Sequence, residues 1–82
     1  MGEYFVYIIR SLSRGTRYVG VSDDVQKRIK EHNEGRCRYT SGRRPWKLLR
    51  EEKLGTLGEA RRRENFLKSG QGRKWLDEFI VD

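Results

Sequence analysis

The sequence is poor in cysteine, proline and histidine, with one of each in 82 residues. A lone Cys37 cannot form a disulfide within the chain, and no second cysteine is present for a thiolate metal site. We interpret Cys37 as an incidental thiol in a reducing, intracellular protein.

Long hydrophobic runs are also lacking. The apolar segment from Phe5 to Ile9 ends at Arg10, which is too short for a signal-peptide core or a membrane span. We therefore expect a cytoplasmic protein with no membrane partner. The length leaves little room for a second unit, so we expect a single domain over residues 1–82.

Acidic residues are in deficit. The chain has 19 Lys and Arg against 12 Asp and Glu, a formal net charge of +7. This balance favours a polyanionic partner, with nucleic acid ahead of an anionic membrane because no lipid anchor is present.

Six of the basic residues lie in one acid-free stretch, 36–50, in which Tyr39 and Trp46 are interleaved. Clustered cations neutralise phosphates, and aromatic rings stack on bases. Trp46 is equally compatible with a place in the core. We predict a nucleic-acid-binding surface that includes Arg36, Arg38, Tyr39, Arg43, Arg44 and Lys47.

Hydrophobic patterning and turn residues predict a β-β-α-β-α-α order. Strands are expected at 4–10, 17–21 and 46–53, and helices at 25–34, 57–68 and 74–80, with a loop over 36–45. The first two strands form a hairpin around Gly15, and Thr56 with Glu59 forms a helix capping box. The predicted fold class is α+β, a small three-stranded antiparallel sheet flanked by about three helices.

The first helix carries Arg28 and His32 at the edge of its buried face. Val25, Ile29 and His32 follow the helical period and should face the core. Arg28 is either a surface cation or the partner of an anion, and His32 taken alone is a core-edge histidine bonded to a backbone carbonyl.

Glu64 shares a helix face with Ala60 and Leu67. A carboxylate on such a face needs a cation. It either forms a salt bridge with Arg28 or a nearby arginine, or it binds Mg²⁺ together with water and a substrate phosphate.

Two tyrosines lie on the two strands of the predicted hairpin. Tyr7 and Tyr18 are either a cross-strand aromatic pair or the hydroxyl lining of a phosphate site. Taken one at a time, the structural alternative is favoured for Arg28, His32, Glu64 and the tyrosine pair.

Taken as an ordered set, these positions resemble the GIY-YIG nuclease superfamily. Phe5-Val6-Tyr7 resembles the first motif by its tyrosine, and Tyr18-Val19-Gly20 resembles the second. The helix carrying Arg28 and His32 and the helix carrying Glu64 follow in the family's order. The resemblance covers essentially the whole chain and is strongest to small stand-alone bacterial members.

The resemblance implies a metal-dependent DNA endonuclease. Glu64 would hold one Mg²⁺ or Mn²⁺, and Arg28 would stabilise the transition state of attack by water. Tyr18 is our first choice for orienting or deprotonating that water, with Tyr7 and His32 in support. Gly20 would keep the strand end small, so that a phosphate can approach.

An alternative is a non-catalytic nucleic-acid-binding module that retains the nuclease fold. The sequence leaves open whether the DNA is single-stranded, branched or duplex. It also leaves open whether a partner protein or a dimer supplies specificity.

Overall fold

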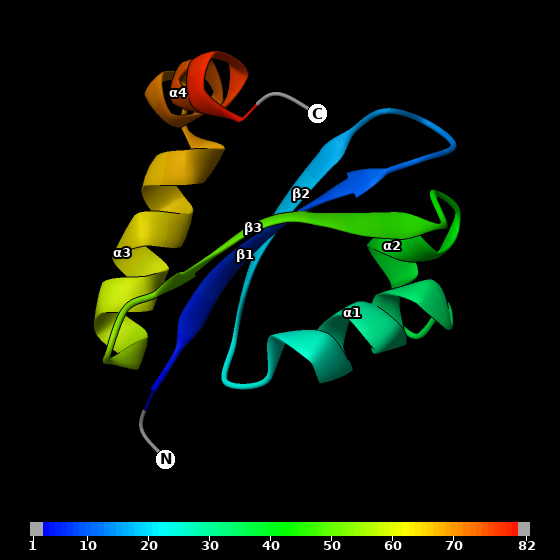
Figure 1. Cartoon of the computed structure of the whole chain (residues 1–82), viewed down its shortest axis with the longest axis horizontal. Coiled ribbons are helices and arrows are strands. Elements are labelled where there is room, and N and C mark those ends of the chain that lie inside the picture. Colours follow the sequence, from blue (N-terminus) through cyan, green and yellow to red (C-terminus); the bar gives the residue numbers. More distant parts are fainter. Residues whose placement is uncertain (1–2, 81–82) are drawn as a thin grey trace.

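A computed structural model describes residues 3–80 and shows a sheet with helices on both sides (Figure 1). The strands lie in the order β2-β1-β3, and both pairings are antiparallel. This confirms the predicted α+β class. In chain order the elements are β1 (Phe5–Ser11), β2 (Arg17–Ser22), α1 (Val25–Asn33), α2 (Arg38–Ser41), β3 (Trp46–Lys53), α3 (Leu57–Lys68) and α4 (Gly70–Phe79).

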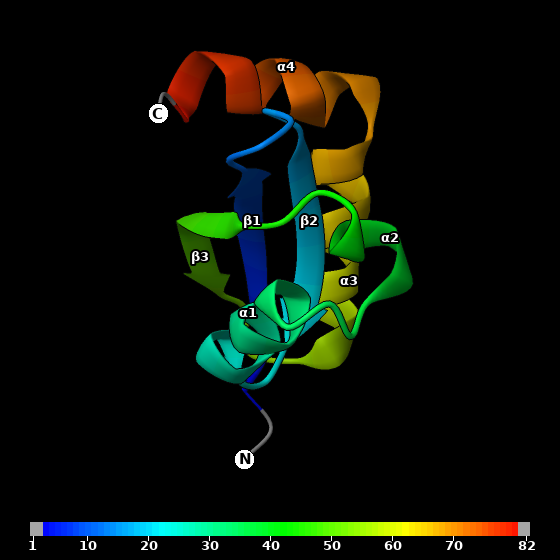
Figure 2. The ribbon, with the colours of Figure 1, turned by 90° about the vertical axis from the view of Figure 1, so that its right-hand side faces the viewer.

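The central strand β1 divides the core into two halves, because successive side chains of a strand point to opposite faces. Val6 and Ile8 pack against α3 and α4, whereas Tyr7 and Ile9 pack towards α1. Figure 2 looks onto the molecule from the side of α1 and α2, which lie in front of the sheet. The α3–α4 half buries Val6, Ile8, Val19, Ala60, Leu67 and Leu76, and the α1–α2 half buries Tyr7, Ile9, Val25 and Trp46.

The helix starts agree with the capping chemistry of the sequence. The side chain of Asp24 accepts a hydrogen bond from the backbone N–H of Lys27 at the start of α1. Thr56 and Glu59 form the predicted capping box of α3. As expected, Val25 and His32 are buried, and Ile29 packs against the same half of the core.

The structure differs from the prediction by more than one residue at two places. The expected loop contains the one-turn helix α2, and the last helix begins at Gly70 rather than at Lys74. The Ser69 side chain accepts a hydrogen bond from the Gly72 N–H and caps α4 directly after α3 ends. A side chain at Gly72 would collide with the Phe66 carbonyl, so this glycine permits the tight corner between α3 and α4.

Within residues 3–80, none of the helices combines the length and the apolar character that crossing a membrane requires.

Candidate active site

A cleft of about 510 Å³ lies at the β2 edge of the sheet, between α1 and α3. Five of the residues singled out from the sequence line it: Tyr7, Tyr18, Gly20, Arg28 and Glu64. They come from β1, β2, α1 and α3, so the fold gathers side chains that are far apart along the chain. The sixth, His32, is fully buried directly behind Tyr7.

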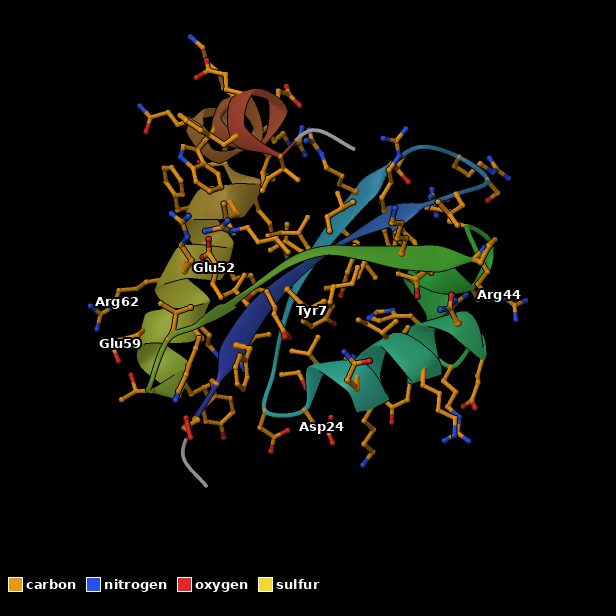
Figure 3. All side chains as sticks on the ribbon, viewed as in Figure 1. Tyr7, Asp24, Arg44, Glu52, Glu59 and Arg62 are labelled. Atoms are coloured by element: carbon orange, nitrogen blue, oxygen red, sulfur yellow. The ribbon has the colours of Figure 1, made fainter. Side chains whose placement is uncertain are left out.

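The Tyr7 hydroxyl begins a buried hydrogen-bond chain. Its oxygen lies 2.9 Å from Nε2 of His32, and Nδ1 of His32 lies 2.8 Å from Oγ1 of Thr40. The Thr40 hydroxyl donates to the Cys37 carbonyl at 3.2 Å. Because that hydroxyl has one proton, it must accept from Nδ1–H of His32, which leaves Nε2 to accept from Tyr7. Figure 3 shows Tyr7 between the sheet and α1.

The pKa values of His32 and Tyr7 in this hydrogen-bond chain favour the neutral form of both groups. Burial lowers the pKa of His32 below its usual 6.5, and the Arg28 charge lowers it further. Burial also raises the pKa of Tyr7, and Tyr18 adds to this effect, while Arg28 opposes it. At neutral pH, His32 is therefore an uncharged proton acceptor and Tyr7 a proton donor towards it. The structural alternative for His32, a bond to a backbone carbonyl, is replaced by these two side-chain partners.

The two tyrosines are neighbours without being directly opposed. Tyr7 pairs with Gly20 across the strands and Tyr18 pairs with Ile9, while the two rings lie 6.4 Å apart at 43°. A Cβ atom at Gly20 would collide with the Tyr7 hydroxyl and ring. Gly20 therefore makes room for the Tyr7 ring as well as lining the cleft.

The charged residues of the cleft pair differently from the predicted structural alternative. Arg28 donates to Glu31 at 2.9 Å, and this hydrogen bond holds the pKa of Glu31 below its usual range. Glu64 pairs with Lys68 at 2.9 Å rather than with Arg28 or another arginine. Because α1 and α3 lie on opposite sides of the sheet, each residue finds its partner within one turn of its own helix.

Two carboxylates line this cleft, those of Asp23 and Glu64, and Glu64 is the one predicted to hold a divalent cation. Its side chain is 16% exposed, and one carboxylate oxygen already contacts the Lys68 ammonium. Over residues 3–80, no group of three or more His, Cys, Asp or Glu side chains could hold a metal ion. A carboxylate completed by water and a substrate phosphate is an arrangement compatible with Mg²⁺ or Mn²⁺.

The predicted basic surface is divided by the sheet. Arg36, Arg38, Tyr39, Arg43 and Arg44 lie within or beside α2. Arg36 pairs with Glu34, and the Arg43 guanidinium lies 4.5 Å from the centre of the Tyr39 ring. Lys47 lies apart from them in a separate hollow beside Arg10 and Leu12, because it points to the opposite face from the buried Trp46.

Sequence reasoning missed three residues of this region. Glu31, Thr40 and Lys68 hold Arg28, His32 and Glu64 respectively. The contacts of Glu31 and Lys68 could have been predicted from the sequence, since each residue lies three or four positions from its partner on one helix. Thr40 gave no signal, because its contact with His32 depends on how α2 packs against α1.

Comparison with known protein families identifies the class. The model of the GIY-YIG catalytic domain matches residues 3–75, and the chain therefore belongs to the GIY-YIG family. Domains of this family are typically nucleases, and membership implies nucleic-acid binding.

The relatives found are small bacterial proteins of the UPF0213 group. The chain is 36% identical over 77 residues to protein SSP2268 of Staphylococcus saprophyticus, covering 93% of both chains. It is 37% identical over 81 residues to protein lwe0147 of Listeria welshimeri, covering 98% of this chain and 88% of the relative. Their names assign no reaction.

A solved relative has the same fold. The solution NMR structure of the UPF0213 protein BH0048 from Bacillus halodurans is 33% identical, with a TM-score of 0.55. The alignment covers 93% of this chain and 83% of that one.

Proposed function

We propose that the protein is a metal-dependent endonuclease that hydrolyses phosphodiester bonds of DNA. The observation that carries the proposal is the convergence of Tyr7, Tyr18, Arg28 and Glu64 on one cleft at the sheet edge. Hydroxyls, a guanidinium and a carboxylate are the groups that in-line attack of water on a phosphate requires. The neighbouring cations of α2 supply attraction for the backbone.

The Tyr7–His32 pair is the proton acceptor in this proposal. A water attacking phosphorus gives a proton to the Tyr7 oxygen while the Tyr7 proton moves to Nε2 of His32. The resulting imidazolium keeps Thr40 as the acceptor of its Nδ1–H. The geometry moves our preference from Tyr18 to Tyr7, because Tyr7 has a neutral base at hydrogen-bond distance; Tyr18 is left to orient the water.

Arg28 lies in the cleft with Glu31 fixing one of its nitrogens. We assign it to neutralise the negative charge that develops on the phosphate oxygens. A divalent cation on Glu64, when bound, would supply Lewis-acid polarisation of the phosphate and stabilise the leaving oxygen. The Lys68 ammonium, which contacts one of the two Glu64 carboxylate oxygens, would compete with that cation.

The test is cleavage of labelled single-stranded, duplex and branched DNA, with Mg²⁺ or Mn²⁺ compared against EDTA. Wild type is expected to cut only with metal, and Glu64→Gln, which keeps the shape of the side chain but removes its charge, is expected to abolish cutting while retaining DNA binding. Glu78→Gln is the matched control, since Glu78 is exposed on α4 and does not line the cleft.

Metal-dependent cutting that survives Glu64→Gln would refute the assigned metal ligand. If wild type binds all three DNAs and cuts none, the non-catalytic nucleic-acid-binding module is the correct function.

A further inference from the structure

A second hollow, of about 610 Å³, adjoins the cleft through a shared wall. Tyr18 lines both. The second hollow lies between the end of the β1–β2 hairpin, α2 and the corner of α3 and α4. Its volume falls within the range of roughly 300–1,000 Å³ typical of small-molecule sites. None of the proposed catalytic groups except Tyr18 reaches it.

The walls of the second hollow are apolar and aromatic. Val19, Leu67 and Leu76 line its interior, and Tyr18 and Tyr39 form its aromatic side. Flat apolar surfaces with aromatic rings suit a nucleobase, whose faces are apolar and aromatic.

The rim of the second hollow is cationic. Arg17, Lys68 and Arg73 line it, and no acidic residue does so among residues 3–80. Arg17 pairs with Asp77 and Lys68 with Glu64. In the described part of the chain, Arg73 makes no ion pair and no side-chain hydrogen bond. An exposed, unpaired guanidinium at the mouth of an apolar pocket complements a phosphate.

Tyr39 is an exposed aromatic held in a fixed position. It is 57% exposed, yet its ring lies 5.9 Å from that of Tyr18, and the Arg43 guanidinium covers it at 4.5 Å. Arg43 also donates to the Tyr39 carbonyl. Two neighbours therefore restrict the ring before any ligand arrives, which reduces the entropy lost on binding.

We propose that the second hollow binds one unpaired nucleobase of the nucleic-acid strand whose phosphate enters the cleft. The strand would pass across Tyr18, with Arg73 contacting a flanking phosphate. A base within an intact duplex has both faces stacked and must leave the stack to enter such a pocket. The substrate class is therefore a strand with an unpaired nucleotide next to the cleaved bond, which deepens the function proposed above and rests on it.

The experiment scans a single abasic position along a short, fluorescently labelled single-stranded oligothymidine. Binding to wild type is measured by anisotropy in EDTA, so that no strand is cut. Removing the base that occupies the hollow should weaken binding roughly tenfold at one position, in line with the value of a stacked base, and leave the other positions nearly unchanged.

Variants of Tyr39 test whether the base at that position occupies the second hollow. Tyr39→Ala should weaken binding of the intact oligothymidine and remove the position dependence, whereas Tyr39→Phe keeps the ring and should retain it. Phe79→Ala is the matched control, since Phe79 is an aromatic residue of similar exposure, 64%, outside both hollows. Thermal melting of each variant checks that it is folded.

A flat scan with wild type, or an unchanged scan with folded Tyr39→Ala, overturns the nucleobase site. The same oligothymidine is also incubated with metal, with wild type and Glu64→Gln in parallel. Glu64-dependent cutting together with a flat scan overturns the nucleobase site alone and leaves the nuclease intact. Absence of any binding overturns both.

Discussion

The two faces of the sheet are built from different chemistry. On the face under α3 and α4 the fully buried core side chains, such as Val6, Ile8 and Leu67, are all aliphatic, and the aromatic side chains packed against them are only partly buried. The face under α1 and α2 buries Tyr7 and Trp46 together with His32 and Thr40, whose polar atoms are all hydrogen-bonded within the face. One strand, β1, supplies both through simple alternation.

One face of the sheet mainly stabilises the fold, and the other mainly positions the proposed catalytic groups. The aliphatic face gains its energy from burial, which an apolar side chain of similar volume can largely provide. The polar face gains little net energy from its hydrogen bonds, but it fixes the tautomer of His32 and the position of the Tyr7 hydroxyl. Substitutions on the two faces should therefore affect different measurements.

The largest expected effect is on the polar face. Tyr7→Phe removes the hydroxyl that relays the proton and should lower the cleavage rate by about 10²–10⁴-fold. It should also cost about 1–3 kcal/mol of unfolding free energy, since Nε2 of His32 loses its partner. Single-turnover cleavage and urea denaturation measure the two effects.

Tyr4→Phe is the matched control. Tyr4 lines the same cleft, and its hydroxyl makes no hydrogen bond within residues 3–80. Equal rates for Tyr7→Phe and wild type would remove Tyr7 from the mechanism.

The next effect belongs to the aliphatic face. Leu67→Ala deletes a fully buried side chain on α3 and should lower the free energy of unfolding by about 2–5 kcal/mol. Urea denaturation measures the loss. The cleavage rate per folded molecule at low temperature should change far less than in Tyr7→Phe. A comparable rate loss in folded Leu67→Ala would show that the two faces are not separable.

A smaller effect concerns the basic residues. Replacing Arg43 and Arg44 by alanine should weaken DNA binding and reduce the slope of log affinity against log salt by about 2. Fluorescence anisotropy over a salt series measures the slope.

Arg62→Ala with Lys74→Ala changes the same charge on α3 and α4 and should leave the slope nearly unchanged. Figure 3 shows Arg62 pointing away from the sheet. Equal slopes for the two double variants would mean that α2 is not the DNA surface.

The smallest effect is a pH dependence. The pKa of His32 is lowered in the folded chain, mainly by burial and further by Arg28, so the unfolded chain binds this proton more readily. The free energy of unfolding should therefore be independent of this group above about pH 6.5, and should decrease as the pH falls below that value until the folded pKa is passed.

His32 is the only histidine, so the slope between about pH 7 and 5.5 can be assigned to it. Its imidazole NMR signals should titrate with a midpoint below 6.5. His32→Gln should remove most of the slope in urea denaturation, and a midpoint above 6.5 would refute the burial argument.

Much of the fold could be predicted from the sequence because its signals are local. The run of β-branched and aromatic residues in β1, the capping box at Thr56 and the helical period of Val25, Ile29 and His32 are signals from residues close together in the sequence. The helix α2 could not be predicted in this way. Its four residues are too few for a period, and tertiary contacts hold it, including the Trp46 Nε1–H bond to the Thr40 carbonyl.

For the candidate site too, only part could be predicted from the sequence. The order of Tyr7, Tyr18, Arg28 and Glu64 along the chain indicated a family, and the fold gathers them in one cleft. Their pairing could not be predicted, since two separate helices decide which cation reaches Glu64 and which anion reaches Arg28. The assigned catalytic and DNA-binding roles stay predictions until the variants are measured.

Tyr18 has a consequence for redesign of this protein. Its ring is a wall of both hollows and also touches Tyr39, His32 and Trp46. A substitution there would alter substrate choice and turnover together, and its effects would not add to those of changes at Tyr39 or Tyr7. Variants with a new preference and an undiminished rate should therefore arise at the far rim, at Arg73 and Arg17, where only one hollow is affected.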